Sequence, residues 1–250
     1  MMHATARGVL TAYRVFGPLD IKNIRRERLL WGLTVLMAVL VLLYRYGVPA
    51  LTAALQARLG FDLVPYYDLV MSMYVGTAAG TAGMVVGFLL LDERDDRTLT
   101  ALLVTPLPVG SYLAYRITVP LVLSFLLTIL TYPLVGIAPL ALPDLLVISG
   151  LASFAGPAAA LFLATFAENK ITGLALTKVI NAVGSLPVLA YFVPTPWQWL
   201  AGLVPGYWPM KALWLAAADE PYWGAAVVGL VVNVAVVWWL LRRFDAIMRR

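Results

Sequence analysis

Residues 69–91 read LVMSMYVGTAAGTAGMVVGFLLL, a run of apolar and small residues that contains no charged side chain. A helix needs roughly 20 such residues to cross the hydrocarbon core of a bilayer, which is about 30 Å thick. Further runs of similar length lie on both sides of this one, and short clusters of charged residues separate them. The sequence therefore predicts six membrane-spanning helices, near residues 29–47, 69–91, 117–135, 145–166, 173–192 and 223–241.

The composition agrees with a membrane protein. Of the 250 residues, 62% are hydrophobic and 12% are charged, and the mean hydropathy is +0.87. Soluble domains are roughly 45–50% apolar and about 25% charged, so this is not the composition of a soluble enzyme. We expect an all-α integral membrane protein in which residues 1–250 form a single transmembrane domain.

Basic residues are distributed unequally between the two sides of the predicted bundle. If the N-terminus is cytoplasmic, every Lys and Arg lies on the cytoplasmic side except Arg45, Arg58 and Lys211. An excess of Lys and Arg in short loops marks the cytoplasmic side of membrane proteins. We therefore expect a multi-pass protein of the plasma membrane with both termini in the cytoplasm. The same rule accounts for the net charge of +5, so nucleic acid is not an expected partner.

Two segments outside the spans carry helical signals of their own. The stretch DIKNIRRERLL, from Asp20 to Leu30, separates apolar from basic residues around a helix. This pattern indicates an amphipathic elbow helix on the cytoplasmic surface, and a plain basic flank is the alternative. Residues 193–222 are rich in Trp, Tyr and Pro, which predicts short re-entrant or interfacial helices on the external side. They would form either an external gate or a membrane-anchored cap with no direct role in transport.

The ionisable residues limit how this protein could be driven. None of the six predicted spans contains Asp or Glu, and Lys178 is the only ionisable residue well inside one. Carriers driven by protons or sodium usually need a carboxylate or His at membrane depth. The sequence also lacks a G-x-x-x-x-G-K-[ST] phosphate loop, so active transport would take its energy from a separate subunit. With no Cys and a single His, at position 3, we expect no catalytic residues and no metal site.

Polar residues form a stripe on each of two predicted spans. Hydroxyl and amide side chains recur at intervals of three or four residues, so each set lies on one helix face. The two sets are Ser124, Thr128 and Thr131 in the third span and Thr177, Asn181 and Ser185 in the fifth. They either form hydrogen bonds between helices or line a substrate path. A third face, of small residues, suits intramolecular packing or dimerisation; it comprises Gly76, Gly80, Gly83 and Gly87.

The cytoplasmic connection between the second and third spans reads DERDDRTLTALLVTPLP, from Asp92 to Pro108. If it is helical from about Asp95, the acidic residues near its start suit the helix dipole, and Pro106 ends it. Its apolar face comprises Leu99, Leu102 and Leu103. An acidic segment is repelled by anionic headgroups, so we expect this short helix to dock onto a protein partner rather than lie on lipid.

This connection resembles the acidic stretch, Thr-Leu, Leu-Leu and Thr-Pro-Leu pattern that follows the second span in ABC-2 type permeases. The six spans, the basic elbow and the second cytoplasmic turn, Glu168-Asn169-Lys170, extend the resemblance over nearly the whole chain. Within that class the chain looks most like fluoroquinolone-export permeases. Four segments carry this likeness: residues 92–95, reading DERD, 104–108, reading VTPLP, 168–170, reading ENK, and 205–209, reading PGYWP.

The resemblance implies a complex in which two permeases pair and two ATPase subunits dock beneath them, with ATP and Mg bound by the ATPase. The second permease would be another copy of this chain or a paralogue. The residues that the resemblance assigns to ATPase coupling are Asp92, Glu93, Arg94, Asp95, Asp96, Arg97, Leu99, Leu102, Leu103, Glu168, Asn169 and Lys170.

The expected function is therefore the membrane subunit of an ATP-driven exporter. Its partners would be an ABC ATPase, a second permease, membrane lipid and an amphipathic, drug-like or antibiotic-like small molecule. Two alternatives remain open. One is a permease of the same architecture that exports a lipid or a natural product for self-protection, and the other is a membrane scaffold or channel that transports nothing with ATP.

Overall fold

The computed structural model describes residues 10, 11, 13, 14, 16–18, 22, 28–95 and 109–248. Within these residues every regular element is a helix. Six helical segments are long and apolar enough to cross a membrane, and each overlaps one predicted span. The prediction of an all-α, six-span membrane protein is confirmed.

Each span consists of one helix or of consecutive helical pieces. The first comprises α2 (Arg28–Leu42), the π-helical η1 (Leu43–Gly47) and α3 (Val48–Leu59), and the second comprises η2 (Val64–Tyr66) and α4 (Tyr67–Asp95). The third is α6 (Val109–Val135), and the fourth comprises α7 (Leu142–Ala152) and α8 (Ala155–Phe166). The fifth comprises α9 (Lys170–Ser185) and the 3₁₀-helix η3 (Leu186–Phe192), and the sixth is α12 (Trp223–Met248). The short helices α10 (Thr195–Ala201) and α11 (Tyr207–Ala217) precede α12.

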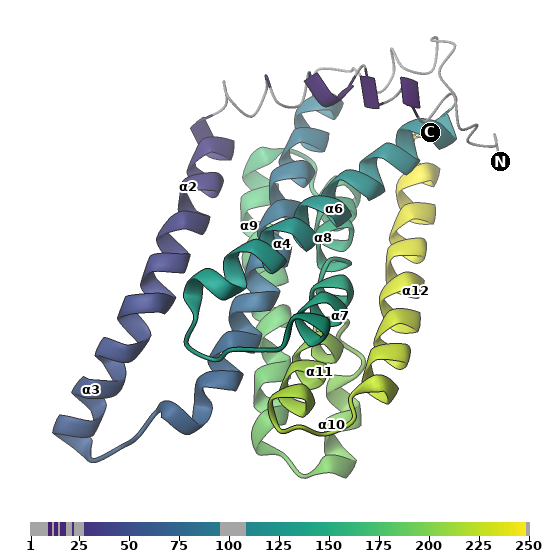
Figure 1. Ribbon diagram of the computed structural model, residues 1–250. Coiled ribbons are helices and arrows are strands. Elements are labelled where there is room, and N and C mark those ends of the chain that lie inside the picture. Colours follow the sequence, from purple (N-terminus) through teal and green to yellow (C-terminus); the bar gives the residue numbers. More distant parts are fainter. Residues whose placement is uncertain are drawn as a thin grey trace.

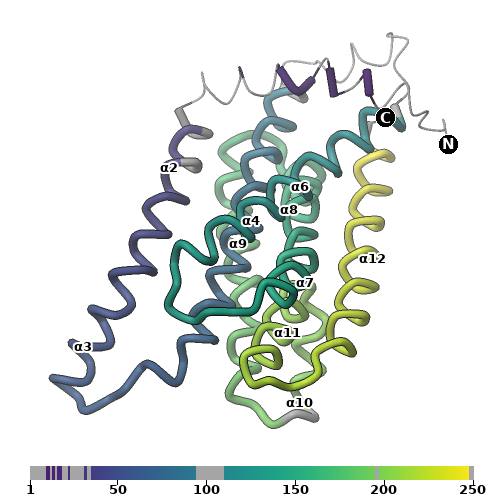
Figure 2. Tube along the Cα trace, viewed as in Figure 1, coloured from purple at the N-terminus to yellow at the C-terminus, as the bar shows by residue number. Residues whose placement is uncertain are grey.

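The bundle has two ends, because consecutive spans run in opposite directions (Figures 1 and 2). We call one of them the terminal end, because α2 begins there and α12 ends there; it is at the top of both views. α4 also ends at the terminal end, and α9 begins there. The other end holds α10 and the connection between α3 and α4, and we call it the hairpin end.

The first span is longer than predicted. The apolar run was expected to end at Gly47, but the helix continues through the π-helical turn to Leu59. Pro49 lies directly after the π-helical turn, in the first turn of α3, and does not end the helix. Gly60 ends the helix in a left-handed conformation, with φ of +66°, and its N–H donates to the carbonyl of Gln56.

α4 forms the centre of the bundle and packs most closely against α8. A Cβ atom at Gly83 would lie 2.2 Å from the carbonyl oxygen of Gly156, and one at Gly87 would lie 2.8 Å from Leu163. The backbones of α4 and α8 therefore meet without intervening side chains. These two members of the predicted small-residue face serve packing within the chain, whereas a Cβ at Gly80 would meet nothing within 4 Å.

The fourth span is broken in its middle, at Ser153 and Phe154. Pro157 explains the break, because a proline has no N–H to donate and its ring crowds the carbonyl four residues earlier. The Ser153 hydroxyl donates to the carbonyl of Gly150 at 2.7 Å. α7 and α8 thus form one crossing that is interrupted at Ser153 and Phe154.

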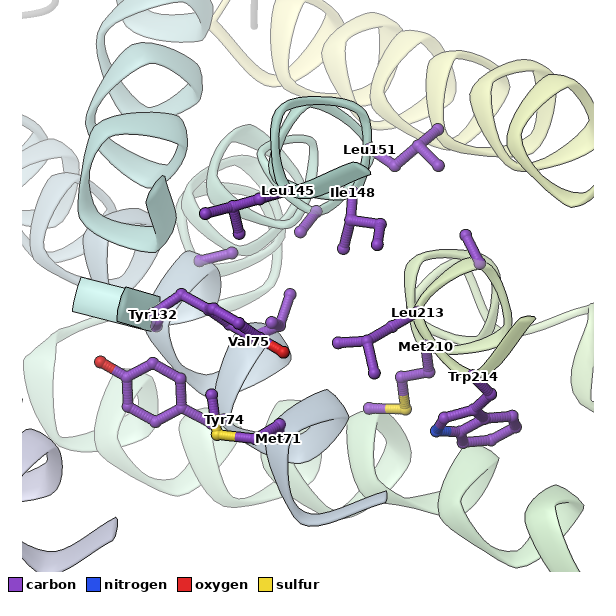
Figure 3. Packing of buried hydrophobic residues seen from close by; sticks show 14 of the residues in the cluster. Met71, Tyr74, Val75, Tyr132, Leu145, Ile148, Leu151, Met210, Leu213 and Trp214 are labelled. Atoms are coloured by element: carbon purple, nitrogen blue, oxygen red, sulfur yellow. The ribbon is translucent and has the colours of Figure 1, made fainter. Parts of the chain in front are cut away.

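The segment between the fifth and sixth spans folds back into the bundle. Seven of the eleven residues of α11 are buried, and Figure 3 shows Met210, Leu213 and Trp214 of α11 directed toward residues of α4 and α7. The Trp214 indole donates to Ser72 Oγ of α4 at 3.0 Å. The predicted short helices of this region are present as α10 and α11.

The turn between α10 and α11 reaches well into the membrane-spanning region. Asn233 Nδ2 of α12 donates to the carbonyl of Pro205 in this turn at 3.3 Å, and also to that of Gly229 at 2.8 Å. Asn233 lies about 10 residues, or about 15 Å, along α12 from its start at Trp223. The hydrogen bond from the Asn233 side chain to Pro205 therefore holds the turn near the middle of the span. α10, the turn and α11 thus form a re-entrant hairpin.

Candidate coupling and transport site

Carboxylates lie at the ends of the spanning helices. The six predicted spans contain no Asp or Glu, but the helices extend beyond those apolar runs. The spanning segments Val64–Glu93, Leu142–Phe166 and Trp223–Ile247 include five carboxylates, which are Asp68, Asp92, Glu93, Asp144 and Asp245. All five lie near the ends of these segments.

Glu93 forms a buried ion pair with Arg116 at the terminal end. Glu93 belongs to the last turn of α4 and Arg116 to the early part of α6, and the guanidinium is fully buried. Arg116 Nη2 donates to Glu93 Oε1, and the Tyr112 hydroxyl donates to Oε2 at 2.6 Å. Arg116 Nε also lies 3.4 Å from the Tyr112 hydroxyl. Both carboxylate oxygens are thus bound, which offsets much of the cost of burying the charges.

Aromatic rings surround the Arg116 guanidinium. Its Cζ lies 5.7 Å from the ring centre of Phe16, 5.4 Å from that of Tyr112 and 5.3 Å from that of Tyr115, within the range of cation–π attraction. Phe16 comes from the N-terminal region, where residues 16–18 are helical, and is itself buried. Phe16 of the N-terminal region therefore packs against the first turns of α6, a contact that the sequence analysis did not predict.

A second ion pair joins α4 to α9. Lys170 Nζ lies 2.7 Å from Asp92 Oδ1, and both side chains are partly exposed. Lys170 is the first residue of α9, and Asn169 caps that helix by accepting a hydrogen bond from the backbone N–H of Thr172 at 3.0 Å. The structure thus brings together Asp92 and Lys170, which the resemblance assigned to the same coupling surface.

Only some of the other predicted coupling residues lie within the described part of the chain. Glu168 and Asn169 are exposed in the turn before α9. Arg94 and Asp95 belong to the last turn of α4. The apolar face predicted for the connection lies outside the described residues, as do its neighbours and most of the predicted elbow; these are Asp96, Arg97, Leu99, Leu102, Leu103 and residues 20, 21 and 23–27.

The polar stripe of the third span faces the interior. Ser124 is fully buried, and its hydroxyl donates to the carbonyl of Ala79 in α4 at 2.6 Å. Thr128 is also fully buried and donates to the carbonyl of Ser124, while the half-buried Thr131 donates to that of Leu127. In this conformation these hydroxyls are satisfied by backbone carbonyls.

The polar stripe of the fifth span lies at the surface of the protomer. Asn181 and Ser185 are exposed, and Thr177 is half-buried. At 100° per residue, Lys178, Asn181 and Ser185 fall within an arc of about 60° on one exposed flank of α9. The exposed side chains of the other flank are apolar and include Val179 and Val183, and Leu186 at the start of η3 continues them.

α4 leaves an open strip beside α9. At the terminal end Gly173 of α9 lies against α4, since a Cβ there would be 2.9 Å from Leu91 and 3.0 Å from Phe88. Toward the hairpin end, Thr77 and Gly80 occupy the same face of α4. Thr77 is exposed, and a Cβ at Gly80 would meet nothing within 4 Å. The face of α4 that α9 covers at one end is therefore uncovered nearer the other.

Polar contacts also hold the hairpin end together. Gln198 Oε1 accepts a hydrogen bond from Lys211 Nζ at 2.9 Å, and Gln198 Nε2 donates to the carbonyl of Val193 at 2.9 Å. The Tyr222 hydroxyl donates to Asp144 Oδ1 at 2.7 Å. Burial, together with this bond to a carboxylate, raises the pKa of Tyr222 to about 12, so the phenol stays protonated and keeps donating at neutral pH.

The sequence contained part of the signal for the buried ion pair. Tyr112 and Arg116 are four residues apart, a spacing that places both side chains on one helix face. Glu93, however, lies on the far side of the 96–108 connection, and no local periodicity relates it to Arg116. The partners become visible only when α4 and α6 are placed side by side.

Comparison with known proteins identifies the family of this chain. A family model described as "Fluoroquinolones export permease protein Rv2686c-like" matches residues 20–241. The chain is 35% identical over 242 residues to the fluoroquinolones export permease protein Rv2686c of Mycobacterium tuberculosis (strain ATCC 25618 / H37Rv), and the match covers 94% of each chain. The same values hold for the fluoroquinolones export permease protein MT2760 of strain CDC 1551 / Oshkosh. No solved structure matches the chain. The chain therefore belongs to the Rv2686c-like family of fluoroquinolones export permease proteins.

Proposed function

We propose that this chain is the membrane-spanning subunit of an ATP-driven exporter that moves an amphipathic, drug-like molecule out of the cytoplasm. A separate ATPase subunit binds ATP and Mg and supplies the energy. The terminal end of the bundle faces the cytoplasm, in agreement with the excess of Lys and Arg there. The relatives named as fluoroquinolone exporters support this class of cargo.

The polar flank of α9 is the observation that carries the proposal. Polar residues that face lipid inside a span are unfavourable. A lysine at the bilayer centre costs about 2.5–3.5 kcal/mol on the scale derived from membrane-insertion experiments, which gives the lowest values. Lys178 and Asn181 on this flank therefore need water or a polar partner, whereas the Ser185 hydroxyl donates to the carbonyl of Ala182 at 2.8 Å. A second permease placed against this side would enclose an aqueous path between two such flanks. The exposed Thr77 of α4 extends the polar lining toward the hairpin end.

The ion pairs supply a route from an ATPase to that path. The 96–108 connection joins the end of α4 to the start of α6. The Glu93–Arg116 pair holds these two helices together next to this connection. A force on the connection would therefore move α4 and α6 as one unit. The Asp92–Lys170 pair would then pass the displacement to α9, which carries the polar flank. A conformational change needs such differential contacts in two states.

We assign the docking of the ATPase to the predicted apolar face of Leu99, Leu102 and Leu103. An amphipathic helix binds a protein partner by placing such a face in a groove. Exposed Glu168 and Asn169 lie in the turn beside Lys170, so they would border the same docking surface.

Asn181→Leu tests the assignment of the path. In inside-out membrane vesicles that contain the complete complex, we expect ATP-dependent uptake of a fluoroquinolone to fall about fivefold to tenfold, because one polar contact along the path is lost. The loss of fluoroquinolone fluorescence from the medium measures the rate.

The matched control is Val231→Leu, which places leucine at an exposed apolar position of α12 and should leave uptake unchanged. Equal uptake by wild type and Asn181→Leu would remove this flank from the path. The absence of ATP-dependent uptake by wild type would contradict the proposed function itself.

A further inference from the structure

Lys178 has an environment that ordinary packing does not explain. It is exposed and lies eight residues into α9, about 12 Å along the helix from the terminal end. No carboxylate in the part of the chain that the structure describes forms an ion pair with it. By contrast, the described lysines at positions 170 and 211 each have a polar partner. A lone ammonium group at this depth calls for an anion from outside the chain.

Lipid phosphate at the nearer surface is one source of such an anion. A lysine side chain on a helix leans toward the N-terminus of that helix, which for α9 is the terminal end, so Lys178 could extend past Leu174 to the headgroups. This explanation accounts for Lys178 alone. It gives no reason for Asn181 and Ser185, which continue the same flank away from those headgroups.

A second feature favours an anion within the path. Asn181 follows Lys178 by three residues on the same flank, so its amide is positioned to bind a polar atom near the group that the ammonium binds. Ser185 follows at the next turn. The flank opposite is apolar, through Val179 and Val183. One cation followed by neutral polar groups, beside an apolar surface, matches a molecule with a single anionic group on an apolar body.

We propose that Lys178 is the anion-recognition residue of the transport path and that it pairs with a carboxylate on an amphipathic cargo. This inference rests on the proposed function and narrows the cargo to amphipathic molecules that carry a carboxylate. Fluoroquinolones have this chemistry, because each carries a carboxylate on a flat aromatic ring system. Charge-assisted hydrogen bonds from an ammonium to a carboxylate are stronger than neutral ones, especially away from bulk water.

The test compares a fluoroquinolone with its methyl ester, which lacks the negative charge of the carboxylate. The complex purified through this chain is placed in lipid nanodiscs, and the binding of a fluoroquinolone and of its methyl ester is measured by their intrinsic fluorescence. For Lys178→Gln, we expect the Kd of the acid to rise tenfold or more, to about the Kd of the ester. The Kd of the ester should change by less than about twofold. Lys178→Arg should restore acid binding, since it keeps the charge.

Lys22→Gln is the matched control, because it removes the same charge from an exposed lysine in the N-terminal region, and it should bind both compounds as wild type does. If Lys178→Gln raises the Kd of the acid and of the ester equally, or changes neither Kd, Lys178 does not recognise the carboxylate. Lys178 then serves the lipid or the fold, and the exporter assignment stands. If wild type binds neither compound, the proposed cargo is wrong and the inference fails with it.

Discussion

Arg116→Met is expected to destabilise the bundle by about 3–5 kcal/mol, because it leaves Glu93 buried without its charged partner. Arg116 is fully buried, and water cannot replace the guanidinium without opening the contact between α4 and α6. The surrounding rings of Phe16, Tyr112 and Tyr115 would also lose their cation. The measurement is the fraction of detergent-solubilised protein that remains monodisperse after heating, and the midpoint should fall well below that of wild type.

A double variant separates stability from coupling. Glu93→Gln combined with Arg116→Met removes both charges and keeps an acceptor for the Tyr112 hydroxyl. Replacing both members of a buried ion pair by neutral groups is often close to neutral for stability, so we expect much of the lost thermal stability to return. Recovery of stability without recovery of transport would identify the pair as part of the coupling route. If Arg116→Met alone were as stable as wild type, the buried pair would not hold α4 to α6.

Gly83→Ala is expected to prevent normal folding of the bundle, although alanine is the better helix former. Its Cβ would lie 2.2 Å from the carbonyl oxygen of Gly156, and that backbone atom cannot move aside as a flexible side chain could. α4 and α8 would have to separate along their whole contact, which also includes Gly87. Overpacking of this kind costs about 1–3 kcal/mol or more. The measurement is the yield of correctly inserted, monodisperse protein.

Gly80→Ala is the matched control, on the same helix and less than one turn away. A Cβ there would meet nothing within 4 Å, so the helix propensity of alanine should dominate. We expect an unchanged or slightly higher yield, since alanine is favoured over glycine by about 0.5–1 kcal/mol in a helix. Equal yields of the two variants would contradict the close packing of α4 on α8.

The six spans could be predicted because each is a long apolar run, and the solvent around them is lipid. Their ends could not be predicted as well. Hydropathy ends where apolar residues end, whereas a helix continues while its backbone hydrogen bonds do, as α3 does until Gly60. This difference also placed Glu93 and Arg116 outside the predicted spans. The buried hairpin helix α11 is short, and no length of apolar sequence distinguishes it from an interfacial helix.

The two polar stripes show what periodicity does and does not determine. Ser124 and Thr128 share a helix face, and so do Asn181 and Ser185, as the spacing predicted. Spacing does not say what the face meets. In α6 it meets the backbone of α4, and in α9 it meets no other helix of the described chain. That distinction depends on residues more than 40 positions apart in the sequence, such as Ala79 and Ser124.

The central claim is that a separate ATPase drives this chain, and purification of the tagged chain from its native membrane in mild detergent tests it most directly. Mass spectrometry of the purified complex should find a subunit with a phosphate loop in equal amount to this chain. A variant with Leu99, Leu102 and Leu103 all replaced by Asp should insert normally and lose that subunit. If wild type is intact and monodisperse in repeated preparations but no such subunit accompanies it, the account of an ATP-driven exporter is wrong.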